Sequence, residues 1–327
     1  MAKSILKEIS VSIKDELNQF DIEFNSALQS DVKLINTVSK YIIQKRGKRF
    51  RPILTILSAH ICGKPTENTY RAAAVMELLH IATLIHDDIV DEAEYRRGWP
   101  SINRVWKNKI SLLMGDYVLS KSLIYMIKMK NFKVLDSIGR TAEDLSSGEL
   151  LQIEKSINKH MSEDVYYKMI EKKTASLIAT ACEMGSITTS EDETDHKALK
   201  EFGTNLGIAF QIKDDLFDLL GEQSETGKDL AQDVISNMIT LPIVHSLNTA
   251  DKQTVRQIKS LLRKVKKSKK VTGELKDIIE STGGFDYAKS KIAEFSKKAL
   301  DAISEYPDTI YKQNLVDLVN YNGNRKK

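Results

Sequence analysis

The sequence predicts an all-α protein. Apolar residues recur every three or four positions along most of the chain, whereas strict alternation of apolar and polar residues is almost absent. The 15 glycines and 5 prolines among 327 residues are about half of the average share of these chain breakers. Few chain breakers leave little room for the many turns of a β-sandwich, and they favour long helices.

The helical pattern can be followed in order along the chain. It begins at residues 3–30, with a break expected near Asp21, and continues from Leu34 to Ile43. Between Arg51 and Asp91 it predicts two apolar helices separated by the turn signal Gly63-Lys64-Pro65, and Gly98-Trp99-Pro100 ends that block. It resumes in the ranges Ile110–Met129, Val134–Lys155, Ser162–Met184, His196–Leu220, Leu241–Leu247, Asp251–Lys270 and Gly273–Glu305. No Ser-, Pro- or Gly-rich linker interrupts the pattern, so we expect one helical-bundle domain over residues 1–327, with a core deep enough to enclose a cavity.

Composition and charge exclude several classes of protein. The two cysteines, Cys62 and Cys182, provide neither a disulfide framework nor a CxxC pair for zinc. The net charge of +4 is the balance of 49 basic and 45 acidic residues, which does not indicate nucleic-acid binding. The N-terminal residues lack the apolar core of a signal peptide, and no stretch reaches the roughly 18 apolar residues of a membrane span. We therefore expect a cytoplasmic protein that binds no nucleic acid.

One acidic pattern, DDxxD, occurs twice, 127 residues apart, and each copy comes after an apolar run. The two copies comprise Asp87, Asp88 and Asp91, and Asp214, Asp215 and Asp218. Aspartates four positions apart share one face of a helix. Carboxylates that close a buried helix need a positive partner, and Mg²⁺ binds such oxygen ligands together with substrate phosphates. A single copy is typical of a solvated helix end, whereas two copies in apolar surroundings favour a metal site on two facing helices.

Basic residues accompany the first acidic pattern. Arg96 and Arg97 follow it, and the segment Arg46-Gly47-Lys48-Arg49-Phe50-Arg51-Pro52 brings four cations together just before a predicted helix. Guanidinium groups bind phosphate oxygens through paired hydrogen bonds, and a helix N-terminus attracts anions. Each basic group alone could be a solvated surface patch. Together with the acidic pairs, they indicate a metal-bridged diphosphate beside a second, metal-free diphosphate.

The ordered set GKRFRP, LLHIATLIHDDIVDEAEYRRG, SGELLQ, KKTA, FQIKDDLFD and TGKDL resembles the motifs of the trans-polyprenyl diphosphate synthases. The resemblance extends from Gly47 to Pro242. It implies the isoprenoid synthase fold, a single large helical bundle around a central cavity. It also implies condensation of isopentenyl diphosphate with an allylic diphosphate, Mg²⁺ as cofactor, and a homodimer with Met114-Gly115-Asp116 in the interface region.

The resemblance further assigns roles to individual residues. The metal ligands are expected to be Asp87, Asp91, Asp214 and Asp218, supported by Asp88 and Asp215. The isopentenyl diphosphate is expected to contact Lys48, Arg51, His80 and Arg97. The allylic diphosphate is expected to contact Arg96, Lys173, Thr174, Gln211 and Lys228. Asp87, Asp91, Asp214 and Lys173 are the expected catalytic residues. Met238 replaces a lysine that is usual in the family, which affects one phosphate contact and no metal ligand.

The resemblance also bears on product length. Ala82 and Thr83 precede the first acidic pattern at positions where short-chain members often carry an aromatic residue. Their small size implies a long product of about thirty to forty-five carbons, a length whose commonest fate is a quinone side chain. The alternatives are a short-chain (farnesyl or geranylgeranyl) synthase and a non-catalytic regulatory subunit of a heteromeric synthase. A terpene cyclase fits less well, because DDLFD replaces the usual second metal motif of that class.

A basic run, Arg263 to Lys270, lies outside these motifs. We interpret it first as a solvated helix end. The second interpretation is a transient contact with a membrane surface during product release.

Overall fold

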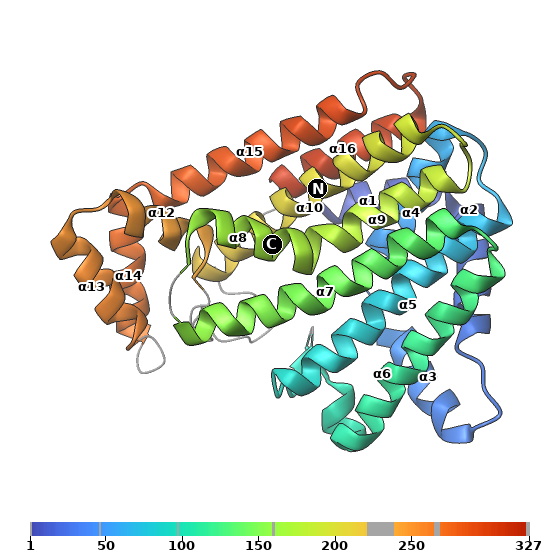
Figure 1. Ribbon diagram of the computed structural model, residues 1–327, viewed down its shortest axis with the longest axis horizontal. Coiled ribbons are helices and arrows are strands. Elements are labelled where there is room, and N and C mark those ends of the chain that lie inside the picture. Colours follow the sequence, from blue (N-terminus) through green and yellow to red (C-terminus); the bar gives the residue numbers. More distant parts are fainter. Residues whose placement is uncertain are drawn as a thin grey trace. The chain divides into compact units, whose positions relative to one another are not determined.

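The computed structural model describes residues 2–45, 47–96, 98–158, 161–220, 239–264 and 269–324. Helices make up nearly all of the regular structure in these ranges, so the all-α prediction is confirmed (Figure 1). The chain divides into two compact units. Unit 1 comprises residues 1–143, 177–203 and 301–318, and unit 2 comprises residues 144–176, 204–300 and 319–327.

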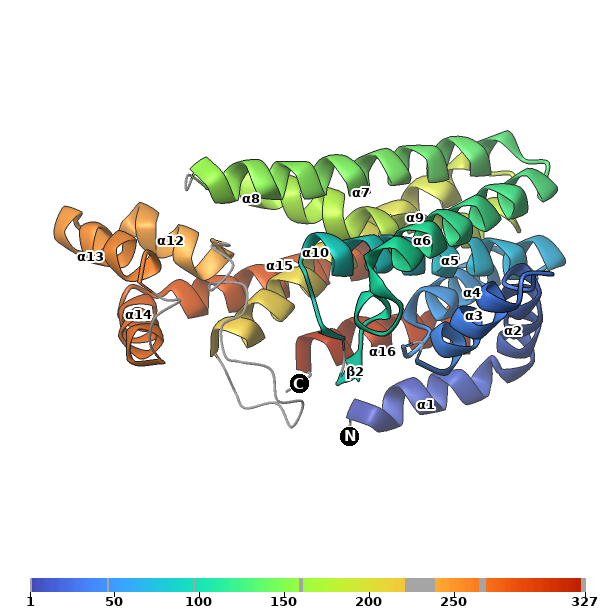
Figure 2. The ribbon, with the colours of Figure 1, turned by 90° about the horizontal axis from the view of Figure 1, so that it is seen from below.

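Unit 1 is organised around helix α5 (Glu67–Val90). Residues 72–79 of this helix are buried without interruption, as expected for the central helix of a bundle. It packs against α2 (Lys14–Ala27), α4 (Phe50–Cys62) and α6 (Ile102–Lys128), and Figures 1 and 2 show α6 alongside it. The helix begins after Thr66, whose side chain forms a capping box with Thr69. The buried middle of α5 therefore anchors the helix whose more exposed C-terminal end carries the first acidic pattern.

The remaining elements complete the two units. Unit 1 also contains α1 (Ala2–Ser12), α3 (Lys33–Lys45), the short strands β1 (Tyr95–Arg96) and β2 (Trp99–Pro100), and nearly all of α9 (Ser176–Ile187). Helices α7 (Phe132–Asn158), α10 (Glu193–Leu220), α15 (Gly284–Ala302) and α16 (Ile310–Asn324) contribute residues to both units.

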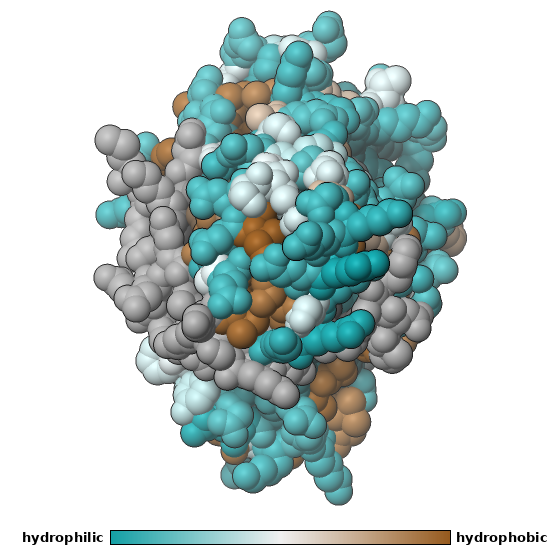
Figure 3. Space-filling model, turned by 90° about the vertical axis from the view of Figure 1, so that its left-hand side faces the viewer, coloured by the Kyte–Doolittle hydropathy of each residue, from teal (hydrophilic) through white to brown (hydrophobic). Residues whose placement is uncertain are grey.

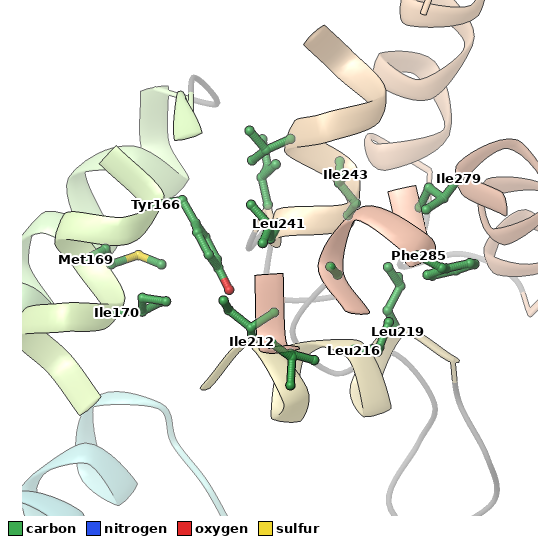
Figure 4. Close-up of a cluster of buried hydrophobic side chains, with 14 of the residues drawn as sticks. Tyr166, Met169, Ile170, Ile212, Leu216, Leu219, Leu241, Ile243, Ile279 and Phe285 are labelled. Atoms are coloured by element: carbon green, nitrogen blue, oxygen red, sulfur yellow. The ribbon is translucent and has the colours of Figure 1, made fainter. Parts of the chain in front are cut away.

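Unit 2 has a hydrophobic core of its own (Figure 4). Side chains from α8 (Glu163–Ile170), the end of α10, α12 (Leu241–Thr249) and α14 (Lys269–Ser281) meet there. Tyr166 and Ile212 are fully buried at its centre, and Leu275 and Ile279 are fully buried on the α14 side. Helix α13 (Lys252–Leu262) packs against α12 and α14. This core fixes the end of α10, where the second acidic pattern lies.

Several helix boundaries differ from those that the sequence predicts. The break expected near Asp21 lies at Ile13, where φ is −124° and ψ is 34°. Ile13 is buried and continues the apolar stripe, so the periodicity does not reveal the break. The helix predicted from Gly273 to Glu305 is divided at Gly283, which has a φ of +75°, and Gly273 itself lies inside α14. Helix α16 was not predicted, because four asparagines and a glycine weaken its helical signal.

Helix α6 is the one helix of the described ranges that is long and apolar enough to cross a membrane, with a mean hydropathy of 1.3 over an 18-residue window. Only 39% of that window is buried, although the helix packs along α5. Its backbone leaves the helical conformation at Lys107, where φ is 67° and ψ is 161°. One side of α6 therefore serves the core of unit 1, and the other side exposes apolar residues.

Candidate active site

The first acidic pattern lies at the C-terminal end of α5. Its three aspartates differ in environment: Asp87 is half-buried, Asp91 is exposed, and Asp88 is buried with 5% of its surface exposed. The buried carboxylate is paired, because Arg96 Nε donates a hydrogen bond to Asp88 Oδ1 at 2.7 Å. Asp87 and Asp91 are one helical turn apart, so they share a face of the helix that Asp88 does not share.

A tight hairpin places Arg96 at the end of α5. Strands β1 and β2 pair antiparallel, with Arg96 opposite Trp99. Gly98 lies in the turn with a φ of +80°, a conformation that strains any residue with a Cβ atom. The hydroxyl of Tyr41 on α3 donates to the carbonyl oxygen of Pro100 at 2.6 Å and fastens the second strand. Arg96 therefore lies on a strand that a turn at Gly98 and a partner strand hold in place, and its side chain is bound to Asp88.

Two of the residues expected to bind isopentenyl diphosphate, Arg51 and His80, lie on helices that pack against each other. Arg51 is half-buried in the first turn of α4, and Lys48 is exposed two residues before that helix. His80 is half-buried on α5, two turns before the first acidic pattern and on the same face. Arg49, by contrast, forms an ion pair with Asp21 at 3.0 Å. The basic segment thus contains one structural ion pair, and its Arg51 begins a helix that packs against α5.

The second acidic pattern lies near the end of α10 in unit 2. Asp214 and Asp218 are half-buried, and Asp215 is buried with 5% of its surface exposed. The hydroxyl of Tyr166 donates to Asp215 Oδ2 at 2.6 Å, and Gln211 Nε2 donates to Asp215 Oδ1 at 2.7 Å. In Figure 4 the hydroxyl of Tyr166 points from α8 toward the helix that carries Ile212. Both patterns therefore bury and bind their second aspartate.

Burial raises the pKa of Asp215 to about 6, and the two hydrogen bonds that it accepts oppose this shift. The charges of Asp214 and Asp218 raise it further. The folded protein consequently holds this proton more tightly than the unfolded chain does. The contribution of Asp215 to folding is therefore complete only below the ordinary pKa of an aspartate, and it is lost as the pH rises through the folded-state pKa of about 6.

The Lys-Lys-Thr-Ala sequence lies in a π-helical turn, Glu171–Ala175, between α8 and α9. Such turns are often found at functional sites. Lys173 Nζ is 2.6 Å from Glu149 Oε2 and donates to Gln152 Oε1 at 2.9 Å. An ammonium group has three N–H donors, so one further donor is available to a ligand. The hydroxyl of Thr174 donates to Gln211 Oε1 at 2.7 Å.

A close helix approach allows these contacts. A Cβ atom at Gly148 of α7 would lie 2.9 Å from the backbone nitrogen of Lys173. No real side chain tolerates that separation, so only glycine lets α7 approach the π-helical turn this closely. The Ser-Gly-Glu-Leu-Leu-Gln sequence thus has two roles. Gly148 permits the close approach, and Glu149 and Gln152, one and four residues after it, are the partners of Lys173.

Sequence reasoning missed three contributors to this arrangement: Tyr166, Glu149 and Gln152. The last two lie within a segment that the sequence had singled out, without a role for either residue. Tyr166 lies 49 residues before Asp215 and belongs to no acidic or basic cluster. Its burial and its hydroxyl bond become visible only once α8 and α10 are packed together.

The donor set of each acidic pattern fits a magnesium ion. Within the described ranges, no group of three or more His, Cys, Asp and Glu side chains could by itself hold a metal ion. Mg²⁺ needs no such cage, since it is usually bound by one or two carboxylates with waters and substrate phosphates. Asp87 with Asp91, and Asp214 with Asp218, are pairs of this kind. Their buried neighbours are already engaged by Arg96 and by Tyr166.

Some predicted positions lie outside the described residues. They are Arg46, Arg97, Lys228 and Met238. The roles expected for them stay predictions.

Comparisons with known proteins agree on one family. The polyprenyl synthetase family model matches residues 32–281. The chain is 31% identical over 323 residues, 97% of each chain, to the all-trans-nonaprenyl-diphosphate synthase (geranyl-diphosphate specific) of Rhodobacter capsulatus. It is 31% identical over 318 residues, 96% of this chain and 89% of the relative, to heptaprenyl diphosphate synthase component 2 of Bacillus subtilis. A crystal structure of a polyprenyl synthase from Caulobacter crescentus, complexed with calcium and isoprenyl diphosphate, is similar with a TM-score of 0.90, at 27% identity over 98% of each chain.

Replacing Tyr166 tests how the second acidic pattern is held. Tyr166→Phe removes a donor from a buried carboxylate, so we expect the free energy of unfolding to fall by about 1–3 kcal/mol. Urea denaturation near pH 8, about two units above the pKa of Asp215, measures the loss with that group ionised. Tyr117→Phe is the matched control, because its hydroxyl bonds an exposed carbonyl oxygen of Gln29. Equal stability losses in the two variants would contradict the assignment.

Proposed function

This chain belongs to the polyprenyl synthetase family, a family of prenyltransferases, and from that membership we propose the reaction that it catalyses. It joins isopentenyl diphosphate head-to-tail to an allylic diphosphate, and it repeats the step until a long-chain all-trans polyprenyl diphosphate is complete. One observation carries the proposal. In each DDxxD pattern the second aspartate is buried and hydrogen-bonded within its own unit, whereas the first and last aspartates lie together on another, more exposed face of the helix.

The first acidic pattern and its basic neighbours bind diphosphate groups in this proposal. Asp87 and Asp91 hold Mg²⁺ against the allylic diphosphate, and Arg96 adds a positive charge beside them. Lys48, Arg51, His80 and Arg97 bind isopentenyl diphosphate without metal. Two observations support the assignment: His80 shares a helix face with the acidic pattern, and α4, which carries Arg51, packs against α5.

The second acidic pattern binds the allylic diphosphate through a further set of residues. Asp214 and Asp218 hold Mg²⁺. Lys173, Thr174, Gln211 and Lys228 contact the phosphate oxygens. The hydrogen-bonded chain from Thr174 through Gln211 to Asp215 supports this assignment, because it ties the π-helical turn to the acidic pattern. A ligand bound at the π-helical turn is therefore linked through these hydrogen bonds to the acidic pattern.

The chemistry follows from the charges of these residues. The allylic carbon–oxygen bond breaks, and its electrons leave with the diphosphate. The double bond of isopentenyl diphosphate forms the new carbon–carbon bond to that allylic carbon, and the released diphosphate accepts the proton whose loss restores a double bond. When bound, Mg²⁺ offsets the negative charge of the departing diphosphate, and the calcium in the Caulobacter crescentus structure supports a divalent cation. Lys173 and Arg96 supply fixed positive charge to the same group.

We propose that the product is long and is used for quinone side chains. The Rhodobacter capsulatus relative is named a nonaprenyl-diphosphate synthase, which supports a long chain. Thr83 is half-buried and lies one turn before Asp87 on the same face of α5, whereas Ala82 is buried with 1% of its surface exposed. Of these two small residues, Thr83 is therefore the better placed to limit a growing chain.

The working protein in this proposal is a cytoplasmic homodimer whose two units act as one domain. The family model matches residues of both units, which supports a single domain. Helix α6 exposes a row of apolar side chains with 47–66% of their surface accessible: Leu112, Leu113, Leu123, Ile124 and Ile127. An exposed apolar face of this kind indicates a protein–protein contact, and a second copy can bury it symmetrically.

Product analysis tests the proposed reaction. The purified protein is incubated with farnesyl diphosphate, labelled isopentenyl diphosphate and Mg²⁺, and we expect a ladder that ends at one long polyprenol. Asp87→Asn and Asp214→Asn each remove a negative ligand, so we expect each to lower kcat by about 100-fold or more. Asp136→Asn, which alters an exposed ion pair on α7, should leave the rate unchanged. The absence of incorporation by the wild type with any allylic primer would contradict the proposal and favour the non-catalytic subunit.

Enlarging Thr83 tests the control of product length. Thr83→Phe should shorten the final product by roughly one or more five-carbon units, the length that one aromatic ring occupies. Thr83→Val keeps the volume and serves as the control. Chromatography of the dephosphorylated products measures both. An unchanged product from Thr83→Phe would show that the end of the chain lies elsewhere.

Charges on the exposed face of α6 test the homodimer. We expect the mass in solution, measured by sedimentation equilibrium, to be that of two chains. Leu113→Glu combined with Ile127→Glu should yield the mass of one chain. Ile22→Glu, at an exposed apolar position of α2, should leave the dimer intact. A wild-type protein that sediments as one chain would contradict this part of the proposal and would favour a separate partner component.

A further inference from the structure

Helix α13 presents a row of positive charges to solvent. Its exposed cations follow the spacing i, i+4, i+7 and i+11, which places them along one face: Lys252, Arg256, Lys259 and Arg263. The opposite face packs into unit 2 through Ile258 and Leu261. We call these four residues the α13 stripe. It is about 17 Å long, from the rise of 1.5 Å per helical residue.

The α13 stripe has no counter-charge within the described part of the chain. None of its four cations forms an ion pair or hydrogen bond there through its side chain. The nearest acid in sequence, Asp251, is used as a helix cap and accepts hydrogen bonds from the backbone of Gln253 and Thr254. Helix α14 packs against α13 and carries Glu274 and Asp277, and neither pairs with the stripe. The stripe therefore keeps its full charge toward solvent.

The charge of the whole chain is concentrated at this segment. Residues 252–270 contain nine lysines and arginines and no acidic residue, whereas the other 308 residues carry 40 basic and 45 acidic side chains. The net charge of +4 thus becomes −5 when this segment is set aside. Like charges at helical spacing repel by a few tenths of a kcal/mol per pair. An external anionic surface would remove this repulsion.

We propose that the α13 stripe docks the protein to the surface of an anionic lipid bilayer. A straight row of cations on an exposed helix can meet a flat array of headgroups simultaneously, at about 1 kcal/mol for each cation. Figure 3 views the side on which α13 and α14 lie in Figure 1, and hydrophilic residues predominate there. Docking would hold the proposed synthase where a long polyprenyl product can leave water.

Nucleic acid fits the α13 stripe less well. Single-stranded nucleic acids are bound by cations together with aromatic side chains that stack on the bases. Residues 251–284 contain no phenylalanine, tyrosine or tryptophan. The rest of the chain is acidic and would repel a long polyanion. Binding to the surface of an anionic bilayer requires only a short patch of positive charge.

Vesicle co-sedimentation without substrates tests the proposal independently of the activity. The full chain is mixed with vesicles of phosphatidylcholine alone or with about 30% phosphatidylserine. One variant carries Lys252→Gln, Arg256→Gln, Lys259→Gln and Arg263→Gln. The matched control carries the same loss of charge at four scattered, exposed lysines: Lys7→Gln, Lys40→Gln, Lys197→Gln and Lys297→Gln. Glutamine keeps the helix propensity, and circular dichroism verifies folding.

We expect the wild type and the control to bind the anionic vesicles equally within about twofold, and the stripe variant, which loses four cations at about 1 kcal/mol each, to bind roughly 1,000-fold more weakly. Neither should bind phosphatidylcholine alone. Equal weakening of the control and the stripe variant would overturn the proposal in favour of a diffuse charge effect. Tighter binding of single-stranded RNA than of vesicles, lost in the stripe variant, would overturn it in favour of a nucleic-acid partner.

Discussion

The rest of the candidate site depends on the burial of one carboxylate in each acidic pattern. Asp88 and Asp215 are almost fully buried, and each is hydrogen-bonded within its own unit, by Arg96 in one case and by Tyr166 and Gln211 in the other. A buried carboxylate without partners would be costly, so these bonds fix the rotation of α5 and α10. The first and last aspartates then share the remaining face of each helix. Their spacing, rather than a closed cage, suits a cation that also binds phosphate.

The surrounding elements serve this arrangement. The hairpin closed by Gly98 places Arg96 at the end of α5, and Gly148 allows α7 to approach the π-helical turn that carries Lys173. Both glycines lie in basic or polar motifs, where their role is to bring the backbone close. In unit 2, Lys173 and Thr174 are each held by a side chain from another helix before any ligand arrives. Such preorganisation suits the role proposed for these two residues, the binding of a departing diphosphate.

The fold and the positions of the acidic patterns could be predicted from the sequence, whereas some helix breaks and side-chain contacts could not. Apolar periodicity predicted the all-α fold and the helices that end in the acidic patterns, because that signal is local. The break at Ile13 escaped it, since a buried isoleucine continues the stripe of both helices. The hydrogen bond of Tyr166 could not be predicted, because its partner Asp215 lies 49 residues away and a lone tyrosine belongs to no motif. From the sequence alone, we interpreted the basic run that begins at Arg263 as a helix end. The exposed face of α13 shows that the row of cations extends back along the helix to Lys252.

We propose that the outer aspartates of both patterns bind divalent cations together with a diphosphate. Electron paramagnetic resonance of Mn²⁺, titrated with and without inorganic diphosphate, measures this binding. We expect diphosphate to tighten Mn²⁺ binding by about tenfold or more, and Asp87→Asn combined with Asp214→Asn to abolish this effect. Mn²⁺ affinity that is unchanged by diphosphate, or is equal in the wild type and the double variant, would contradict it.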